Sequence, residues 1–211
     1  MIKDKKYISC SVCGTQIFPA DKRVKSIKAV RGFRYIICPD CELGILYPKQ
    51  KKQSLENIYE KENYFVELSA PVQNPITQWF FTRQIFQSSS EWAIKNFKAG
   101  KILDVGCGNG EFLSDLQAGG WDVWGSDISS FAVKNTGKKI GKNRVKQGEF
   151  PNQTYSQKFD VISFWHILEH VENPIDYLEK AKRMLKDDGT IIGEMPNFDS
   201  ALLRRFPLHY Y

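Results

Sequence analysis

The second half of the chain alternates short apolar segments with segments of helical hydrophobic periodicity. The apolar segments predict five strands, at residues 102–105, 121–126, 144–150 (the third strand with its exit loop), 158–164 and 190–195. Helical patterns lie between them, and the clearest begins at Asn173-Pro174 and is expected to end at Gly189. This alternation predicts an α/β fold with a doubly wound parallel sheet. We expect the strand order 3-2-1-4-5, with the fifth strand at an edge.

Two helices are predicted ahead of the sheet, at residues 54–68 and 74–98. The second begins at Asn74-Pro75, where a cap residue precedes a proline at the first helical position. Its stripe of aromatic and aliphatic residues favours core packing over a ligand cage. Tyr59 and Tyr64 fit either a surface position or a lid over a site.

Four of the five cysteines form two Cys-x-x-Cys pairs, Cys10 with Cys13 and Cys38 with Cys41. Two such pairs can hold one zinc ion in a tetrahedron of thiolates at about 2.3 Å. The 24 residues between the pairs slightly exceed the usual spacing. The alternatives are disulfides, which a reducing compartment disfavours, and a redox Cys-x-x-Cys, which would not need two copies. We expect structural zinc, with no open position for catalysis.

The sequence around the cysteines fits a small metal-stapled module. Gly14 follows the second cysteine, where a tight turn favours a positive φ. Segments 24–30 and 33–37 predict two short strands of a β-ribbon. A module of about 45 residues cannot bury a sufficient core alone, so a metal is expected to stabilise it. The expected domains are a zinc ribbon at 1–50, a helical linker at 51–100 and a sheet domain at 101–211.

The composition, 42% hydrophobic and 26% charged, is typical of a globular protein. No apolar stretch approaches the roughly 18 residues of a membrane span. The start lacks the apolar core of a secretion signal, so we expect a cytoplasmic protein without a membrane span. Residues 1–52 hold 12 Lys/Arg against 4 Asp/Glu, which raises the question of nucleic acid or another phosphate-bearing partner. A solvated lysine-rich module is the favoured interpretation. The oligomeric state stays open.

A glycine-rich loop, Gly106-x-Gly108-x-Gly110, joins the first strand of the sheet to a helix. Glycines allow the backbone to approach a ligand closely because they have no Cβ. A dinucleotide site reads G-x-G-x-x-G and places a pyrophosphate on the helix amides, but Glu111 would repel that group. Asp104, near the end of the strand, could instead receive an ammonium group. The loop therefore favours a nucleoside that carries an amino acid.

The ends of the second and third strands supply further candidates. Asp127 lies at the tip of the second strand, where a carboxylate can accept hydrogen bonds from both ribose hydroxyls. Glu149 and Phe150 lie on the exit loop of the third strand, beside the expected adenine. We interpret Cys107, within the glycine loop, as a small packing residue rather than a nucleophile.

Five segments occur together in the order and spacing of one known family. They are Asp104-x-Gly106-x-Gly108-x-Gly110, Asp127, Phe159-Asp-Val-Ile, His166-Ile-Leu-Glu-His170 and Leu185-Lys-Asp-Asp-Gly-Thr190. On these segments, residues 75–200 resemble the class I S-adenosylmethionine-dependent methyltransferases. The two cysteine pairs followed by Leu43-Gly-Ile-Leu-Tyr-Pro48 are similar to enzymes that modify sugars or polysaccharides. This resemblance implies a small-molecule acceptor, a nucleotide- or lipid-linked sugar methylated on carbon or oxygen.

The resemblance also implies roles for individual residues. The methionine part of S-adenosylmethionine would contact Asp104 and the loop amides, and Asp127 would hold the ribose. The full expected set of cofactor residues is Asp104, Gly106, Gly108, Gly110, Asp127, Ile128, Glu149 and Phe150. His166, just beyond the fourth strand, is the candidate base, with a pocket wall as its alternative. Glu169 and His170 are weaker candidates.

Two other functions stay open at this point. An RNA methyltransferase could grip phosphates with the basic ribbon, although no Asn-Pro-Pro-Tyr-type motif and no catalytic cysteine pair is present. A non-catalytic adaptor could keep the methyltransferase shape, although the intact glycine loop and Asp127 argue against it. Only 111 residues follow position 100, fewer than the family's complete sheet needs. We therefore expect a fragment of a longer protein that keeps some cofactor affinity but shows little or no turnover.

Overall fold

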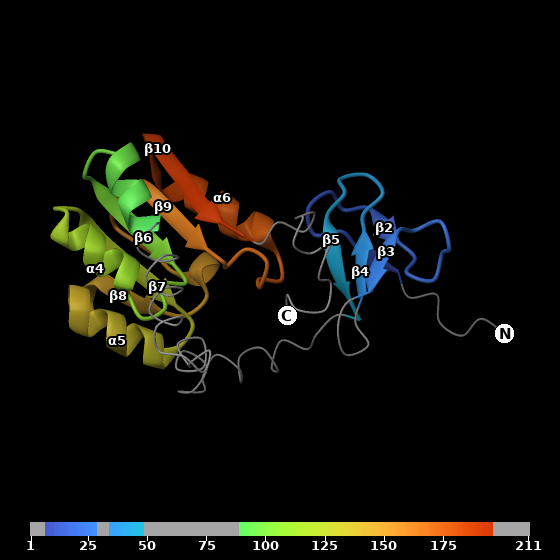
Figure 1. The fold of residues 1–211 in the computed structure, drawn as a ribbon, viewed down its shortest axis with the longest axis horizontal. Helices are drawn as coiled ribbons and strands as arrows, with labels where there is room; N and C mark the ends of the chain where they lie inside the picture. The colour runs from blue at the N-terminus through green and yellow to red at the C-terminus, as the bar shows by residue number, and fades with distance from the viewer. Residues whose placement is uncertain (1–6, 29–33, 49–88, 196–211) are drawn as a thin grey trace, which may run out of the picture. The chain divides into compact units, whose positions relative to one another are not determined.

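The computed structural model describes residues 7–28, 34–48 and 89–195, which lie in two compact units (Figure 1). In the larger unit, five parallel strands form one sheet in the order β10-β9-β6-β7-β8. The strands are β6 (Lys101–Val105), β7 (Asp122–Asp127), β8 (Val145–Gln147), β9 (Phe159–Trp165) and β10 (Leu185–Glu194). Numbered along the sheet domain, this is the predicted order 3-2-1-4-5, which is confirmed.

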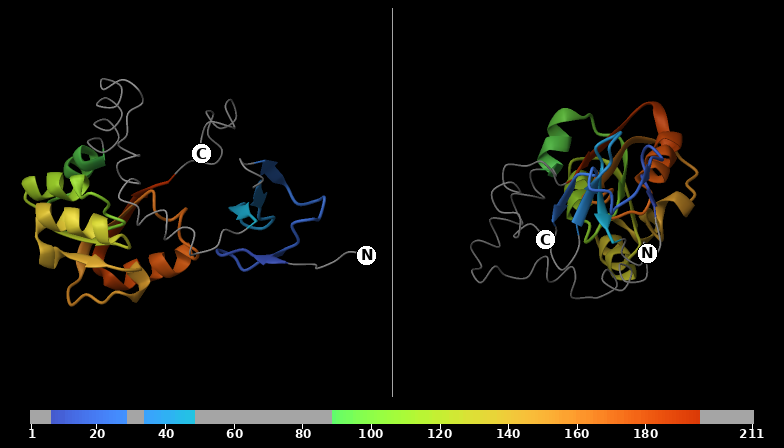
Figure 2. Two further views of the ribbon diagram at one scale, coloured as in Figure 1. Left: turned by 90° about the horizontal axis from the view of Figure 1, so that it is seen from below. Right: turned by 90° about the vertical axis from the view of Figure 1, so that its right-hand side faces the viewer.

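Helices pack against both faces of this sheet (Figure 2). They are α4 (Glu111–Ala118), α5 (Ser130–Ile140) and α6 (Pro174–Met184), with two 3-10 turns, η1 (Lys142–Arg144) and η2 (Phe150–Asn152). Successive strand residues point to opposite faces. Ile102 accordingly packs with residues of α4 and α5, whereas Leu103 packs with residues of α6. Each face of the sheet therefore has its own apolar core, as a doubly wound fold requires.

One element boundary differs from the expectation. The helix that was expected to end at Gly189 ends at Met184, because Leu185 already pairs with Phe159 of β9 and starts β10. A register shift between Leu185 and Thr190 accommodates the extra residues. The third strand, expected with its exit loop over residues 144–150, ends at Gln147, and the exit loop begins at Gly148, which has a φ of 117°.

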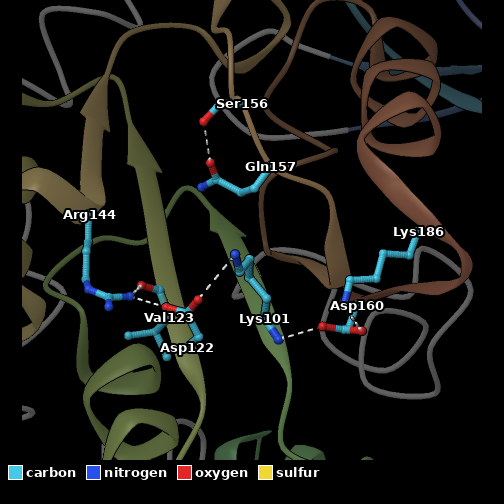
Figure 3. A network of polar contacts seen from close by, with 8 residues as sticks. All are labelled: Lys101, Asp122, Val123, Arg144, Ser156, Gln157, Asp160 and Lys186. Carbon is cyan, nitrogen blue, oxygen red and sulfur yellow. Dashed lines mark hydrogen bonds and ion pairs between the residues drawn. The ribbon is translucent and has the colours of Figure 1, made fainter.

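A ladder of charges crosses the sheet near the amino ends of its strands (Figure 3). Its members, in sheet order, are Lys186, Asp160, Lys101, Asp122 and Arg144, with alternating sign. Asp160 accepts from Lys186 Nζ and from the backbone N–H of Lys101, both at 2.7 Å. Asp122 pairs with Arg144 and, at 3.5 Å, with Lys101 Nζ. Burial alone would raise the pKa of both aspartates, but these partners lower it.

The smaller unit contains the four cysteines and two small sheets. A two-stranded sheet pairs β1 (Ile8–Ser9) with β2 (Gln16–Ile17), and a three-stranded antiparallel sheet has the order β3-β4-β5. Its strands are β3 (Ser26–Lys28), β4 (Arg34–Ile37) and β5 (Gly44–Tyr47). The segments expected at 24–30 and 33–37 correspond to β3 and β4, whereas β5 was not predicted as a strand. Ile17 and Ile36 form a small apolar core with Cys10 and Cys38.

Several expectations concern parts of the chain that lie outside the described residues. These are the helix at 54–68, most of the helix at 74–98, Tyr59, Tyr64 and the segment after 195. Residues 89–96 are helical, in agreement with the expected end of the second helix. In the parts of the chain that are described, no helix has the length and apolar character to cross a membrane.

Candidate functional site

Most of the predicted site residues of the larger unit lie at the carboxyl ends of its strands. Because the strands are parallel and adjacent, the loops that follow β6, β7, β8 and β9 meet at this one edge of the sheet. The glycine loop follows β6, Asp127 ends β7, Glu149 lies two residues after β8, and His166 directly follows β9.

The glycine loop has a conformation that favours glycine at three positions. Gly106, Gly108 and Gly110 have φ angles of 77°, 51° and 76°. A Cβ on Gly106 would lie 2.0 Å from Cδ1 of Ile167, so the loop after β9 packs directly on this position. The backbone N–H groups of Gly106 and Cys107 both donate to the carbonyl of Ser126 on β7, at 2.7 and 3.0 Å. The spacing of the glycines thus corresponds to a real steric requirement.

Asp104 is a buried carboxyl group below this loop, only 3% exposed. Ser163, its neighbour in the register between β6 and β9, donates its hydroxyl to Asp104 Oδ1 at 2.7 Å. Burial raises the pKa of Asp104 to about 7, with the Ser163 hydrogen bond opposing this effect and the negative charge of Asp127 adding to it. No described residue forms an ion pair with Asp104. Within the described residues the carboxyl group has no cationic partner, as expected of a group that receives an ammonium ligand.

Asp127 connects the end of β7 to the glycine loop. Its Oδ2 accepts the backbone N–H of Gly108 at 3.0 Å, and its Oδ1 accepts that of Ser129 at 2.9 Å. Burial raises the pKa of Asp127, against these backbone hydrogen bonds. A carboxylate offers about four lone-pair sites, so Asp127 keeps capacity for a further hydrogen bond beside these backbone donors and the N–H of Ile128. The neighbouring Ile128 is 39% exposed, an apolar side chain open to solvent beside this carboxylate.

The exit of β8 brings Glu149 and Phe150 to different environments. Glu149 is half-buried and accepts from the Asn152 amide at 3.2 Å. The ring of Phe150 is buried in the core, 6.0 Å from the ring of Phe164 and 5.9 Å from that of Tyr177. A nucleoside at this edge could therefore meet the backbone of Phe150 but not the face of its ring.

His166 lies between two glutamates, one in the loop after β9 and one at the end of β10. Its Nδ1 lies 3.5 Å from Glu169, its Nε2 lies 3.7 Å from Glu194, and its backbone N–H donates to the Glu194 carbonyl at 2.8 Å. The hydrogen bond to Glu169, with the charges of Glu169 and Glu194, raises the pKa of His166 despite partial burial. Its φ of 54° is unfavourable for a residue with a Cβ, and such strain is concentrated at functional sites. Burial lowers the pKa of His170.

Glu111 and Cys107 lie at the glycine loop, and their contacts decide the charge of the first and the reactivity of the second. Glu111, at the start of α4, pairs with Lys139 of α5 at 2.8 Å, so its charge is partly offset. Cys107 is buried, and burial raises the pKa of its thiol well above the ordinary value. A thiol in this state is a poor nucleophile, consistent with a packing role.

The four cysteines of the smaller unit form a separate candidate metal centre. Their sulfur atoms all lie within 4.8 Å of one another and none is in a disulfide. Cys10 and Cys41, and likewise Cys13 and Cys38, have sulfurs 3.5 Å apart. Four sulfurs about 2.3 Å from one zinc ion would be separated by about 3.8 Å, so the cluster fits this ion.

The two Cys-x-x-Cys turns have the same backbone geometry. In each, the first cysteine accepts from the residue four positions later, Gly14 or Glu42, and this residue has a positive φ. The prediction for Gly14 is confirmed, at 76°. The Thr15 hydroxyl lies 3.1 Å from Cys13 Sγ and donates to Asp40 at 2.5 Å, which joins the two turns. Interactions with the side chain and the backbone of Thr15 lower the pKa of Cys13 to about 6.

Three residues of the larger site were not singled out from the sequence. Ser163 was the most accessible to prediction, because a polar residue inside an apolar strand needs a partner. Glu194 ends a strand at the edge where ligands bind, which was also a usable signal. Thr136 of α5 donates its hydroxyl to the Gly108 carbonyl at 2.7 Å, and nothing local in the sequence marks it.

Residues 80–211 match the protein family described as "Methyltransferase domain". The chain belongs to this family. Together with the glycine loop and Asp127, the match identifies the larger unit as a class I methyltransferase domain, a family whose cofactor is S-adenosylmethionine. The resemblance predicted from the sequence is thereby confirmed.

The methyltransferase domain is similar in sequence to curated enzymes. It is 32% identical over 101 residues to the ubiquinone biosynthesis O-methyltransferase of Actinobacillus pleuropneumoniae serotype 5b. It is 34% identical over 102 residues to the enzyme of that name from Glaesserella parasuis serovar 5. In both cases the match covers 43% of this chain and 43% of the relative, so less than half of either protein is compared.

Solved structures show the same fold. A S-adenosylmethionine-dependent methyltransferase from Thermotoga maritima has a TM-score of 0.53 and 22% identity, covering 72% of this chain and 66% of that one. The magnesium protoporphyrin IX methyltransferase of Synechocystis, solved with bound SAH, has a TM-score of 0.52 and 18% identity, covering 64% and 68%. At these identities the likeness concerns the fold.

Proposed function

We propose that this chain binds S-adenosylmethionine through its methyltransferase domain and transfers the methyl group to a small molecule. The observation that carries the proposal is the position of Asp127, a buried carboxylate beside a loop of three positive-φ glycines at the carboxyl edge of the sheet. This is the place where doubly wound sheets bind nucleosides. The family match supports the cofactor, and the names of the curated relatives support a small acceptor.

The residues of this edge fit the parts of the cofactor. Asp104 meets the ammonium group, while Gly106, Gly108 and Gly110 leave room for the backbone to approach the methionine part. Asp127 accepts the ribose hydroxyls with its remaining lone pairs. Ile128 and the backbone of Phe150 border the adenine, and Glu149 accepts from its amino group. When bound, S-adenosylmethionine supplies a methyl group attached to a sulfonium.

The protein's own contribution to the transfer is positioning and proton removal. Holding the acceptor in line with the methyl group converts an encounter of two molecules into a reaction within one complex. His166 takes the proton that a hydroxyl or carbon acid must lose. Its place after β9, its strained backbone and its carboxylate neighbours support this role over that of a pocket wall.

The four cysteines hold one structural zinc ion in this proposal, and residues 1–50 form its zinc ribbon ahead of a linker at 51–100 and the domain at 101–211. The fit of the sulfur positions to a tetrahedron supports the metal. The combination of ribbon and methyltransferase domain favours a nucleotide- or lipid-linked sugar as acceptor, methylated on carbon or oxygen. The names of the relatives favour oxygen.

Calorimetry with purified protein tests the cofactor site. We expect S-adenosylmethionine and S-adenosylhomocysteine to bind and NAD not to bind. Asp127→Ala should weaken binding at least tenfold, as expected for hydrogen bonds to a charged group. Asp122→Ala is the matched control, because it changes the same residue type at the opposite end of the same strand and should leave the affinity unchanged. Equal affinities of the two variants would contradict the assignment.

A transfer assay with labelled methyl groups tests the acceptor. Sugar nucleotides, a phenolic acceptor and RNA are compared in parallel, and labelling of the sugar nucleotide is expected. Labelling of the phenol alone would overturn the sugar assignment but keep the small-molecule class. Labelling of RNA, with a steep salt dependence, would overturn both.

A further inference from the structure

Helix α5 contacts the glycine loop through a residue that the proposed function does not use. Thr136 lies in the middle of this helix and is fully buried. Its hydroxyl donates to the carbonyl of Gly108 at 2.7 Å. On the other side of the same residue, the N–H of Gly108 donates to Asp127 at 3.0 Å. Gly108 is therefore held at both of its backbone polar groups, by side chains from β7 and α5.

The contacts of Thr136 extend over most of the loop. A Cβ placed on Gly110 would lie 2.7 Å from its Oγ1, and the thiol of Cys107 lies 3.8 Å from the same oxygen. The neighbouring Asn135 donates its amide to Asn109 at 3.3 Å. Four consecutive loop residues, 107–110, thus meet two adjacent side chains of α5.

The direction of the hydroxyl indicates more than packing. A threonine inside a helix can donate its hydroxyl to a carbonyl of its own helix. The hydroxyl of Thr136 has one proton, and it is used on Gly108 instead. Gly108 has a φ of 51°, and glycine adopts many other conformations at similar energy. A loop held in one of these conformations before a ligand arrives loses less entropy on binding.

We propose that Thr136 is a positioning residue for the cofactor, acting through the carbonyl of Gly108. The inference rests on the proposed S-adenosylmethionine site and adds a residue that does not touch the ligand. Thr136 fixes the orientation of the Gly108 backbone, and Asp127 has two functions, since it holds the same residue from the opposite side. The loop is thereby preformed in the free protein.

Two variants of Thr136 separate positioning from packing. Thr136→Val keeps the shape and removes the hydroxyl, whereas Thr136→Ser keeps the hydroxyl and removes a methyl group that packs near Gly110. Both are expected to lower the Tm. We expect Thr136→Val to weaken S-adenosylhomocysteine binding about fivefold to tenfold, as for the net loss of one hydrogen bond. Thr136→Ser should stay within about twofold of the wild-type chain.

Amide hydrogen exchange of the free protein gives an independent readout. Thr136→Val should speed exchange in the loop at residues 107–110, and Thr136→Ser should not. Equal affinity of wild type and Thr136→Val, or equal weakening by both variants, would overturn the positioning role while leaving the cofactor site intact. A wild-type chain that binds no S-adenosylhomocysteine would refute the proposed function, and with it a role of Thr136 toward that ligand.

Discussion

Replacing Asp104 by asparagine should make the free protein more stable and its cofactor site weaker. Asp104 is buried, and the resulting pKa of about 7 means that its ionised form is disfavoured in the native state. Asparagine has nearly the same shape and can still accept the hydroxyl hydrogen bond from Ser163 through Oδ1. The substitution therefore removes a buried charge without opening a cavity.

The size and sign of the effect follow from the pKa. An aspartate with a pKa near 3.8 in the unfolded chain and about 7 in the native state binds more protons when folded, between about pH 4 and pH 7. The free energy of unfolding contributed by this group therefore falls as the pH rises through this window. The total loss is of order 4 kcal/mol. Asparagine does not titrate, so the stability of Asp104→Asn relative to wild type should increase with pH by up to this amount.

Urea unfolding at several pH values between 5 and 8.5 covers the upper part of this window and should show about 2–3 kcal/mol of the increase. Titrating groups that do not interact with Asp104 are common to both proteins, so they cancel in the comparison. Asp160→Asn is a control of opposite sign, because the partners of Asp160 lower its pKa. Its stabilising contribution is already complete above about pH 4, so Asp160→Asn should be less stable by at most about 1 kcal/mol, independently of pH in this range.

Cofactor binding supplies the second half of the test. An ammonium group favours the ionised form of Asp104, so the affinity of the wild-type chain for S-adenosylhomocysteine should rise from pH 6 to pH 8. Asp104→Asn should bind at least tenfold more weakly and without this pH dependence. A stability difference that does not change with pH, or a wild-type chain more stable than Asp104→Asn at pH 8, would refute the reasoning.

Three further predictions concern other parts of the chain. Metal analysis should find one zinc per chain, and Cys38→Ser should reduce this content and lower the Tm of the ribbon; well under one zinc with disulfide-bonded cysteines would contradict the metal site. Gly106→Ala should destabilise the domain by about 2 kcal/mol or more and abolish cofactor binding, because it combines a positive φ with a clash against Ile167. The control is Gly120→Ala, which changes a positive-φ glycine whose added Cβ would meet no atom within 4 Å. It should cost about 1–2 kcal/mol of stability. His166→Gln should lower kcat while S-adenosylhomocysteine affinity stays unchanged. The activity of the wild-type chain should rise with pH around a midpoint above 6.5, because the pKa of His166 is raised, and the variant should lose this rise. An unchanged pH profile would make His166 a pocket wall.

The sequence was most informative where a short segment determines its own geometry. The glycine spacing at 106–110 and the cysteine pairs each require a local turn, and the positive φ values confirm the turns. Strand order was predictable because alternating strands and helices leave few topologies. The end of α6 was not, because Gly189 after Lys-Asp-Asp resembles a helix end until the pairing of Leu185 with Phe159 is known.

Polar contacts between distant elements were beyond prediction for a physical reason. Thr136 and Gly108 are separated by 28 positions, and Asp104 and Ser163 by 59. Each side chain alone is compatible with ordinary packing, and its role follows only from the strand register and helix placement. The position of the Phe150 ring has the same origin, since Phe164 and Tyr177 come from later elements.

The aspartates at the two edges of the sheet have opposite electrostatic surroundings. At the amino edge, Asp122 and Asp160 have basic partners and lowered pKa values, so their charges stabilise the fold. At the carboxyl edge, Asp104 and Asp127 are buried, have raised pKa values, and form no ion pair with any described residue. Such groups reduce the stability of the free protein, and natural sequences retain this cost where function requires it. A ligand that brings an ammonium group and hydroxyl donors would interact favourably with both carboxyl groups. The burial of these carboxyl groups therefore destabilises the free domain and favours the ligand-bound one.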